Sequence, residues 1–191
     1  NDAGNQMNNL AASVNARYLE LLGKPAEIPE NGYHGHDIIE TAQAIIDQDG
    51  DKYLDMPEAE RLELFKDRAY AEKLKALKRD LAHFNVHYDN WFSERTLHPD
   101  AIQAACKVLE ERGKIYEKDG ALWLKSTDYG DDKDRVVIRD NGVPTYLAAD
   151  IAYHKNKYDR GFKKMINIWG ADHHGYVARV KAAMAALGYD V

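Results

Sequence analysis

The sequence lacks the features of secreted, disulfide-linked and membrane-spanning proteins. It holds a single cysteine, Cys106, so no internal disulfide can form, as is typical of a reducing compartment. No apolar run approaches the roughly 20 residues of a membrane helix, and the N-terminus shows no secretory or transit segment. We therefore expect a soluble, cytoplasmic protein. Cys106 falls in the apolar stripe of an expected helix and is best interpreted as a small core residue.

An excess of positive charge is absent as well. The 26 Lys and Arg stand against 32 Asp and Glu, which gives a formal net charge of −6 at pH 7. This balance excludes a uniformly basic coat for nucleic acid but leaves room for a local basic strip. Glycine-rich phosphate loops and the His-Glu-x-x-His zinc motif are also missing. What the chain does have is 45% apolar residues, enough for one sizeable core or two small ones.

Helical periodicity covers about half of the chain. Apolar residues recur at spacings of three and four, and Gly and Pro stand at the expected ends. Helices are predicted at 6–22, 37–47, 57–83, 100–112, 146–157 and 175–187.

Short hairpins are predicted between the fourth and fifth helices. Asp119-Gly120 separates two apolar stretches at 115–116 and 122–124, and an Asp-Gly pair favours a tight turn. Residues 136–138, followed by Asn141-Gly142, indicate a second hairpin.

Two further strands are predicted, a short one at 86–92 and an apolar one at Met165–Trp169. The second lies between two predicted helices, and a helix–strand–helix order with an apolar strand indicates a parallel α/β sheet. In such sheets, ligands bind beyond the carboxyl ends of the strands. The polar loop at 170–176 follows this strand, so we interpret Asp172, His173 and His174 as binding residues. The alternative is that Asp172 only caps the next helix and the histidines lie on the rim.

A second candidate site lies on the predicted helix at 146–157. Tyr146, Asp150 and His154 are spaced by four, so they share one helix face. A carboxylate beside a phenol suits a guanidinium or ammonium group. The spacing alone favours the simpler interpretation of a solvated face, with Asp150 stabilised near the first turn by the helix dipole.

Metal binding and RNA binding are weaker alternatives. The acidic run 131–134 has the look of a cation loop but lacks the glycine and distal Glu of a calcium site, so a solvated charge run is favoured. The histidines and aspartates at 150–154 and 172–174 could ligate a divalent metal, but no known metal-binding motif supports this alternative. A basic strip lies on the third predicted helix, where a salt-bridged surface is favoured over an RNA contact. It comprises Arg61, Lys66, Arg68, Lys73, Lys75, Lys78 and Arg79.

Seven segments, in order along the chain, resemble arginyl-tRNA synthetase, a class I aminoacyl-tRNA synthetase. They are residues 1–6 (NDAGNQ), 91–95 (WFSER), 120–123 (GALW), 129–136 (YGDDKDRV), 142–146 (GVPTY), 150–154 (DIAYH) and 169–176 (WGADHHGY). Each segment alone is modest evidence, but the seven together are specific.

The resemblance implies a ligase that converts L-arginine and ATP into arginyl-adenylate and then transfers arginine to tRNA(Arg). By analogy, Tyr146 and Asp150 hold the substrate guanidinium and Glu94 lies near its charged groups. Gly170, Asp172 and His173 line the ATP site, with His173 also facing the arginine pocket. Mg²⁺ is expected to come with ATP, with no protein-bound metal, and the enzyme is expected to be a monomer.

The implied fold is α/β: an incomplete Rossmann-like parallel sheet with largely helical insertions. Residues 1–23, 84–97 and 136–191 would belong to the catalytic domain. Residues 24–83 would form a helical insertion, and 98–135 an insertion of a helix plus a hairpin. The chain opens on Asn rather than Met and ends at a strand-like sequence, so we expect a piece of a longer protein. Two other functions remain open, a metal-dependent phosphoesterase using 172–174 and an RNA- or protein-interaction module centred on 37–83.

We predict that the 191-residue chain alone does not form arginyl-adenylate. The resemblance places the two signature loops that bind ATP phosphates, of the His-Ile-Gly-His and Lys-Met-Ser-Lys-Ser types, outside this sequence. Adenylyl transfer depends on preorganised positive groups around the phosphates. Arginine-dependent exchange of pyrophosphate into ATP should therefore be absent, and exchange by the purified chain would contradict the prediction.

Overall fold

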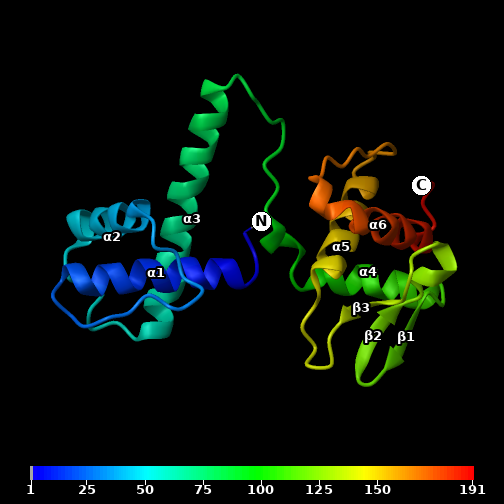
Figure 1. Ribbon diagram of the computed structural model, residues 1–191, viewed down its shortest axis with the longest axis horizontal. Coiled ribbons are helices and arrows are strands. Elements are labelled where there is room, and N and C mark those ends of the chain that lie inside the picture. The colour runs from blue at the N-terminus through cyan, green and yellow to red at the C-terminus, as the bar shows by residue number, and fades with distance from the viewer. Residues whose placement is uncertain (1) are drawn as a thin grey trace. The chain divides into compact units, whose positions relative to one another are not determined.

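The computed structural model describes residues 2–191, which form two compact units, one up to Phe92 and one from Ser93 onward. All six predicted helices are present, with ends within a few residues of the expected ones (Figure 1). None of the helices in the described part of the chain is both long and apolar enough to cross a membrane.

The first unit consists of three helices, α1 (Asn5–Leu21), α2 (His36–Asp49) and α3 (Glu58–His83), with α1 packed against both others. The apolar stripes predicted from the sequence meet in one core. Three fully buried aromatic rings lie at its centre. Phe65 lies edge-on to Tyr18 at 5.0 Å and to Tyr53 at 5.6 Å between ring centroids, a favourable aromatic geometry.

The prediction that Arg61 belongs to a basic strip on the surface of α3 is wrong, because its side chain points into the first unit. It is buried and donates hydrogen bonds to Asn15 Oδ1 at 2.6 Å and to the carbonyl oxygens of Tyr53 and Met56, both at 3.1 Å. The guanidinium thus binds backbone carbonyls of the α2–α3 connection, where an arginine supplies several donors at once. Four other members of the strip form surface ion pairs, in agreement with the salt-bridged interpretation: Lys66–Glu63, Arg68–Asp49, Lys73–Asp37 and Arg79–Asp80.

The second unit combines three helices with a small antiparallel sheet. Its elements are η1 (Glu94–Leu97), α4 (Asp100–Glu111), β1 (Ile115–Lys118), β2 (Ala121–Leu124), η2 (Ser126–Tyr129), β3 (Arg135–Ile138), α5 (Tyr146–Asp159), η3 (Ala171–His173) and α6 (His174–Leu187). The helix α5 packs against both α4 and α6.

The sheet confirms the first predicted hairpin, whereas the second is formed only as a turn closed by one isolated bridge. β1 and β2 pair antiparallel around Asp119 and Gly120, whose φ angles are both positive (52° and 74°), as the favoured two-residue hairpin turn requires. β3 pairs with β2 on the other side, and Ile138 forms an isolated bridge with Pro144.

The predicted strands at Met165–Trp169 and 86–92 are not strands in this structure. Both segments are irregular, and Ile166 and Ile168 are 76% and 93% exposed. A strand exists only where a neighbour accepts and donates its backbone hydrogen bonds. Among residues 2–191, the only hydrogen-bonded sheet is the antiparallel β1–β2–β3, and it does not extend to either segment. The two segments do contain apolar residues, but the prediction that they pair as strands is wrong for the described residues.

Replacement of Phe65 by alanine should destabilise the first unit by about 3–5 kcal/mol, because it removes a fully buried ring and leaves a cavity. Urea unfolding of the chain measures the change in free energy of unfolding. Phe84, which is 84% exposed, offers a matched control, and Phe84→Ala should cost no more than about 0.5 kcal/mol. Similar losses in the two variants would contradict the assigned core.

Candidate functional site

The start of α5 is held by the strand before it. Thr145 is the N-cap: its hydroxyl oxygen accepts from the Ala148 N–H, and its own N–H donates to the Val137 carbonyl at 2.9 Å. These bonds fix where α5 leaves β3. Tyr146, the first residue of the helix, is 61% exposed, and Asp150 lies one turn later in a half-buried position.

Asp150 binds a residue that the sequence reasoning did not single out. The Tyr176 hydroxyl donates to Asp150 Oδ2 at 2.6 Å and so links α6 to α5. Burial, with this hydrogen bond as a second cause, raises the pKa of Tyr176 well above its ordinary value, so the phenol stays protonated and remains a donor. Tyr176 does fall in the segment 169–176, but nothing in the spacing of that loop shows that it reaches α5.

His154 lies one further turn along α5 and is buried. Its Nδ1 lies 2.8 Å from the Asp150 carbonyl oxygen, and its Nε2 lies 3.1 Å from the Asn167 amide nitrogen. A carbonyl oxygen only accepts, so the proton sits on Nδ1 and Nε2 accepts from Asn167. Both ring nitrogens are therefore engaged within the protein, and His154 is not placed to ligate a metal.

Glu94 lies near the same carboxylate. It begins η1, which packs against α5, and its Oε1 lies 3.7 Å from His98 Nε2. Burial raises the pKa of Glu94, and the negative charge of Asp150 adds to the rise. The structure thus places two predicted site residues, Glu94 and Asp150, on elements that pack together, η1 and α5.

The other predicted binding residues lie on an exposed turn. Gly170 precedes η3, and a Cβ built on it would stand 2.6 Å from Asp172 Oδ1, so the Asp172 carboxylate folds back over the glycine. His173 Nε2 lies 3.6 Å from Asp172 Oδ2, with both side chains largely in solvent. Trp169 lies edge-on to Tyr176, with ring centroids 5.7 Å apart, and the residues of the turn between them are exposed.

The segment that supplies all these groups also matches a known protein family. Residues 46–191 match the tRNA synthetases class I (R), catalytic domain. The chain belongs to this family of class I synthetases. It is 58% identical over its full length to proteins named arginine–tRNA ligase from Carboxydothermus hydrogenoformans and Moorella thermoacetica. The chain spans about a third (34%) of the length of these relatives.

A solved structure agrees with the sequence match. A crystal structure described as an arginyl-tRNA synthetase from Campylobacter jejuni has a TM-score of 0.90 and 42% identity. The match covers all of this chain and 42% of the other. The predicted fold class, that of a class I synthetase catalytic domain, is therefore confirmed, while the parallel strand at 165–169 is not formed here.

The acidic run of this synthetase domain proves to be a structural element. Asp131, predicted to lie in a solvated charge run, is buried and accepts two hydrogen bonds from the Arg135 guanidinium, at 2.8 and 2.7 Å. Asp134 accepts from Tyr116 and Thr127 at 3.0 and 2.8 Å. Protein donors thus occupy the carboxylates that a cation would need. Within residues 2–191, no group of three or more His, Cys, Asp or Glu is placed to hold a metal ion.

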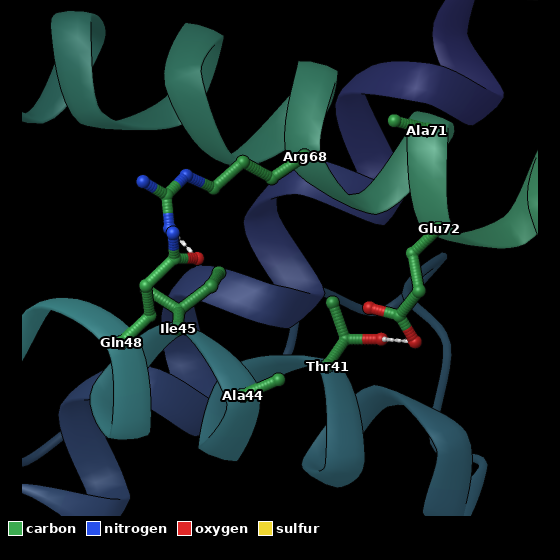
Figure 2. Close-up of a pocket in the computed structure, with 7 residues that line it drawn as sticks. All are labelled: Thr41, Ala44, Ile45, Gln48, Arg68, Ala71 and Glu72. Atoms are coloured by element: carbon green, nitrogen blue, oxygen red, sulfur yellow. Dashed lines mark hydrogen bonds between the residues drawn. The ribbon is translucent and has the colours of Figure 1, made fainter.

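A pocket of about 330 Å³ lies in the first unit (Figure 2). It opens between α2 and α3 and is lined by Thr41, Ala44, Ile45, Gln48, Arg68, Ala71 and Glu72. Its charged groups already bind neighbours: Glu72 accepts from Thr41 at 3.0 Å, and Arg68 pairs with Asp49 at 2.5 Å. The charged side chains that line the pocket therefore link α2 to α3.

The single thiol of the synthetase domain is expected to be unreactive. Burial raises the pKa of Cys106 to about 11, so at pH 8 only about one thiol in a thousand is ionised. Reaction with a disulfide reagent such as dithionitrobenzoate should be at least tenfold slower in the folded chain than in denaturant. Equal rates would contradict both the burial and the assignment of Cys106 as a packing residue.

Proposed function

We propose that this chain is the central part of an arginine–tRNA ligase. The complete enzyme would join the carboxylate of L-arginine to the α-phosphorus of ATP, release pyrophosphate, and pass the arginyl group to the terminal adenosine of tRNA(Arg). The observation that carries the proposal is the pair of half-buried carboxylates, Asp150 and Glu94, in a domain whose relatives are named arginine–tRNA ligase. Family membership favours neither the phosphoesterase nor the interaction module.

The arginine pocket would be built on the start of α5. Asp150 supplies the negative charge for the guanidinium, which a carboxylate can bind through two parallel hydrogen bonds. Tyr146, one turn earlier and exposed, offers its ring and hydroxyl beside the same group. Glu94 would bind a positively charged group of the substrate. Burial raises the pKa of Glu94, and a positively charged substrate group beside it would favour the ionised carboxylate.

The nucleotide would bind at the turn before α6. Gly170, Asp172 and His173 are exposed there, directly before α6, where the positive end of the helix dipole favours an anionic group. His173 would lie between the ATP and arginine sites. No metal cluster is present among residues 2–191, so we assign no Mg²⁺ ligand to this chain and propose that the ion arrives on the phosphates of ATP. We propose that the enzyme works as a cytoplasmic monomer, as the resemblance implies.

We also propose the domain division implied by the resemblance. Residues 1–23, 84–97 and 136–191 would form the nucleotide-binding part, and 24–83 and 98–135 would be insertions. The helix α1, which lies within 1–23, shares one core with α2 and α3, since Val14 and Tyr18 pack with Phe65, so we propose that the insertion folds against α1.

Asp150→Asn in the full-length enzyme that contains this chain should raise the KM for arginine on the order of 100-fold, with the KM for ATP changed little. The substitution keeps the shape of the side chain and removes the charge that binds the guanidinium, and a buried charge-assisted pair contributes a few kcal/mol. Pyrophosphate exchange at varied arginine and ATP measures both constants.

Asp159→Asn is the matched control for this experiment. Asp159 lies on the same helix, is exposed, and pairs with Lys155 at 2.7 Å. It should leave both constants close to those of the unmodified enzyme. Equal loss of arginine and ATP recognition in Asp150→Asn would count against the assigned role.

A further inference from the structure

We infer that Tyr176 is a positioning residue for arginine recognition: it orients the Asp150 carboxylate and thereby favours a guanidinium over a simple ammonium group. The inference rests on the proposed function, because it assigns a role to Tyr176 within the proposed arginine pocket. Tyr176 acts through Asp150, and no contact between Tyr176 and the substrate is required.

The hydrogen bond between the two residues is short and joins separate elements. Tyr176 belongs to the first turns of α6 and Asp150 to the first turns of α5, and the two helices pack together (Figure 1). The hydroxyl donates to Oδ2 at 2.6 Å, in the range of charge-assisted O–H···O⁻ bonds. A carboxylate without such a partner would rotate about its Cβ–Cγ bond, a soft torsion with broad minima. The bond therefore selects one plane for the carboxylate.

The Tyr176 ring is itself held in place. The Trp169 ring lies edge-on to it, with centroids 5.7 Å apart and an angle of 75° between the planes. On α6, the Arg179 guanidinium carbon lies 4.9 Å from the Tyr176 centroid. Contacts from the preceding loop and from the next turn of the helix thus fix the ring, and with it the position of the hydroxyl.

A second link supports the same turn of α5. The His154 Nδ1–H donates to the Asp150 carbonyl oxygen, and Asn167 donates to His154 Nε2 at 3.1 Å. The segment 167–176 therefore contacts α5 twice, once at the Asp150 carboxylate and once one turn later. The backbone and the side chain of Asp150 are both constrained.

This arrangement leaves the carboxylate able to bind a substrate. The hydroxyl uses one lone pair of Oδ2, so Oδ1 and the remaining lone pair of Oδ2 can accept the two parallel N–H groups of a guanidinium. That fork is planar and needs a carboxylate in a matching plane, whereas an ammonium is a point charge that tolerates any orientation. Loss of the orienting bond should therefore weaken arginine binding more than lysine binding.

The test is Tyr176→Phe in the full-length enzyme, which keeps the ring and removes only the hydroxyl. The KM for arginine in pyrophosphate exchange should rise about tenfold, the loss typical of a hydrogen bond to a charged group. The KM for ATP should change little, and the inhibition constant of L-lysine should change less than the KM for arginine.

Tyr116→Phe is the matched control, because the Tyr116 hydroxyl also donates to a carboxylate, Asp134 Oδ2 at 3.0 Å, on a different element. It should leave the arginine KM unaltered. In the double variant Asp150→Asn/Tyr176→Phe, the loss should not exceed that of Asp150→Asn alone, since the hydroxyl acts through the carboxylate.

Three results would overturn the inference while leaving the proposed function intact: an unchanged arginine KM in Tyr176→Phe, equal changes for arginine and ATP, or additive losses in the double variant. An arginine KM that is unchanged in Asp150→Asn would instead overturn the proposed arginine site, and the role of Tyr176 with it.

Discussion

The hydrogen bond from Tyr176 to Asp150 connects the parts of the second unit that carry the proposed chemistry. It joins residues 26 positions apart, at the starts of two packed helices, and it engages a half-buried carboxylate with a donor that stays protonated. A carboxylate in this setting needs either a hydrogen-bond donor or a cation, because partial removal from water disfavours its charge. The phenol meets part of that need, and a cationic substrate would meet the rest. The Tyr176–Asp150 hydrogen bond and the proposed preference for a cationic substrate therefore have the same cause, the need of this carboxylate for a donor or a cation.

The first unit also contains a buried charged group, and its hydrogen bonds stabilise the fold. The buried Arg61 guanidinium is satisfied by the Asn15 side chain and by backbone carbonyls of the α2–α3 connection, next to an aromatic core of Tyr18, Tyr53 and Phe65. Asp131 and Arg135 do the same in the second unit, with the carboxylate buried and bound on both oxygens. In both places, charged side chains that the sequence suggests are on the surface are instead buried, and their hydrogen bonds fix the conformation of a connecting segment.

The helices and hairpins were predictable because their determinants are local. A spacing of three and four residues identifies an apolar stripe wherever the helix packs, and an Asp-Gly pair selects its turn within four residues. The strand at 165–169 could not be predicted in the same way. Its apolar residues are real, but strand pairing depends on a neighbour elsewhere in the chain, and none is supplied by residues 2–191. The prediction of a strand at 86–92 was wrong for the same reason: its aromatic residues are typical of strands, but its backbone is irregular.

For the site, the sequence by itself determined the candidate residues and the family to which they point. Asp150 and Tyr146 share a helix face by spacing alone, and ordered motifs carry the resemblance that the family match and the solved relative support. Helix packing, which motifs and spacing do not reveal, brings Tyr176 to Asp150, places η1 with Glu94 against α5, engages both ring nitrogens of His154 and buries Arg61. The reason is physical: each of these facts depends on a distance between elements far apart in the chain, and such distances are set by the packing of whole helices.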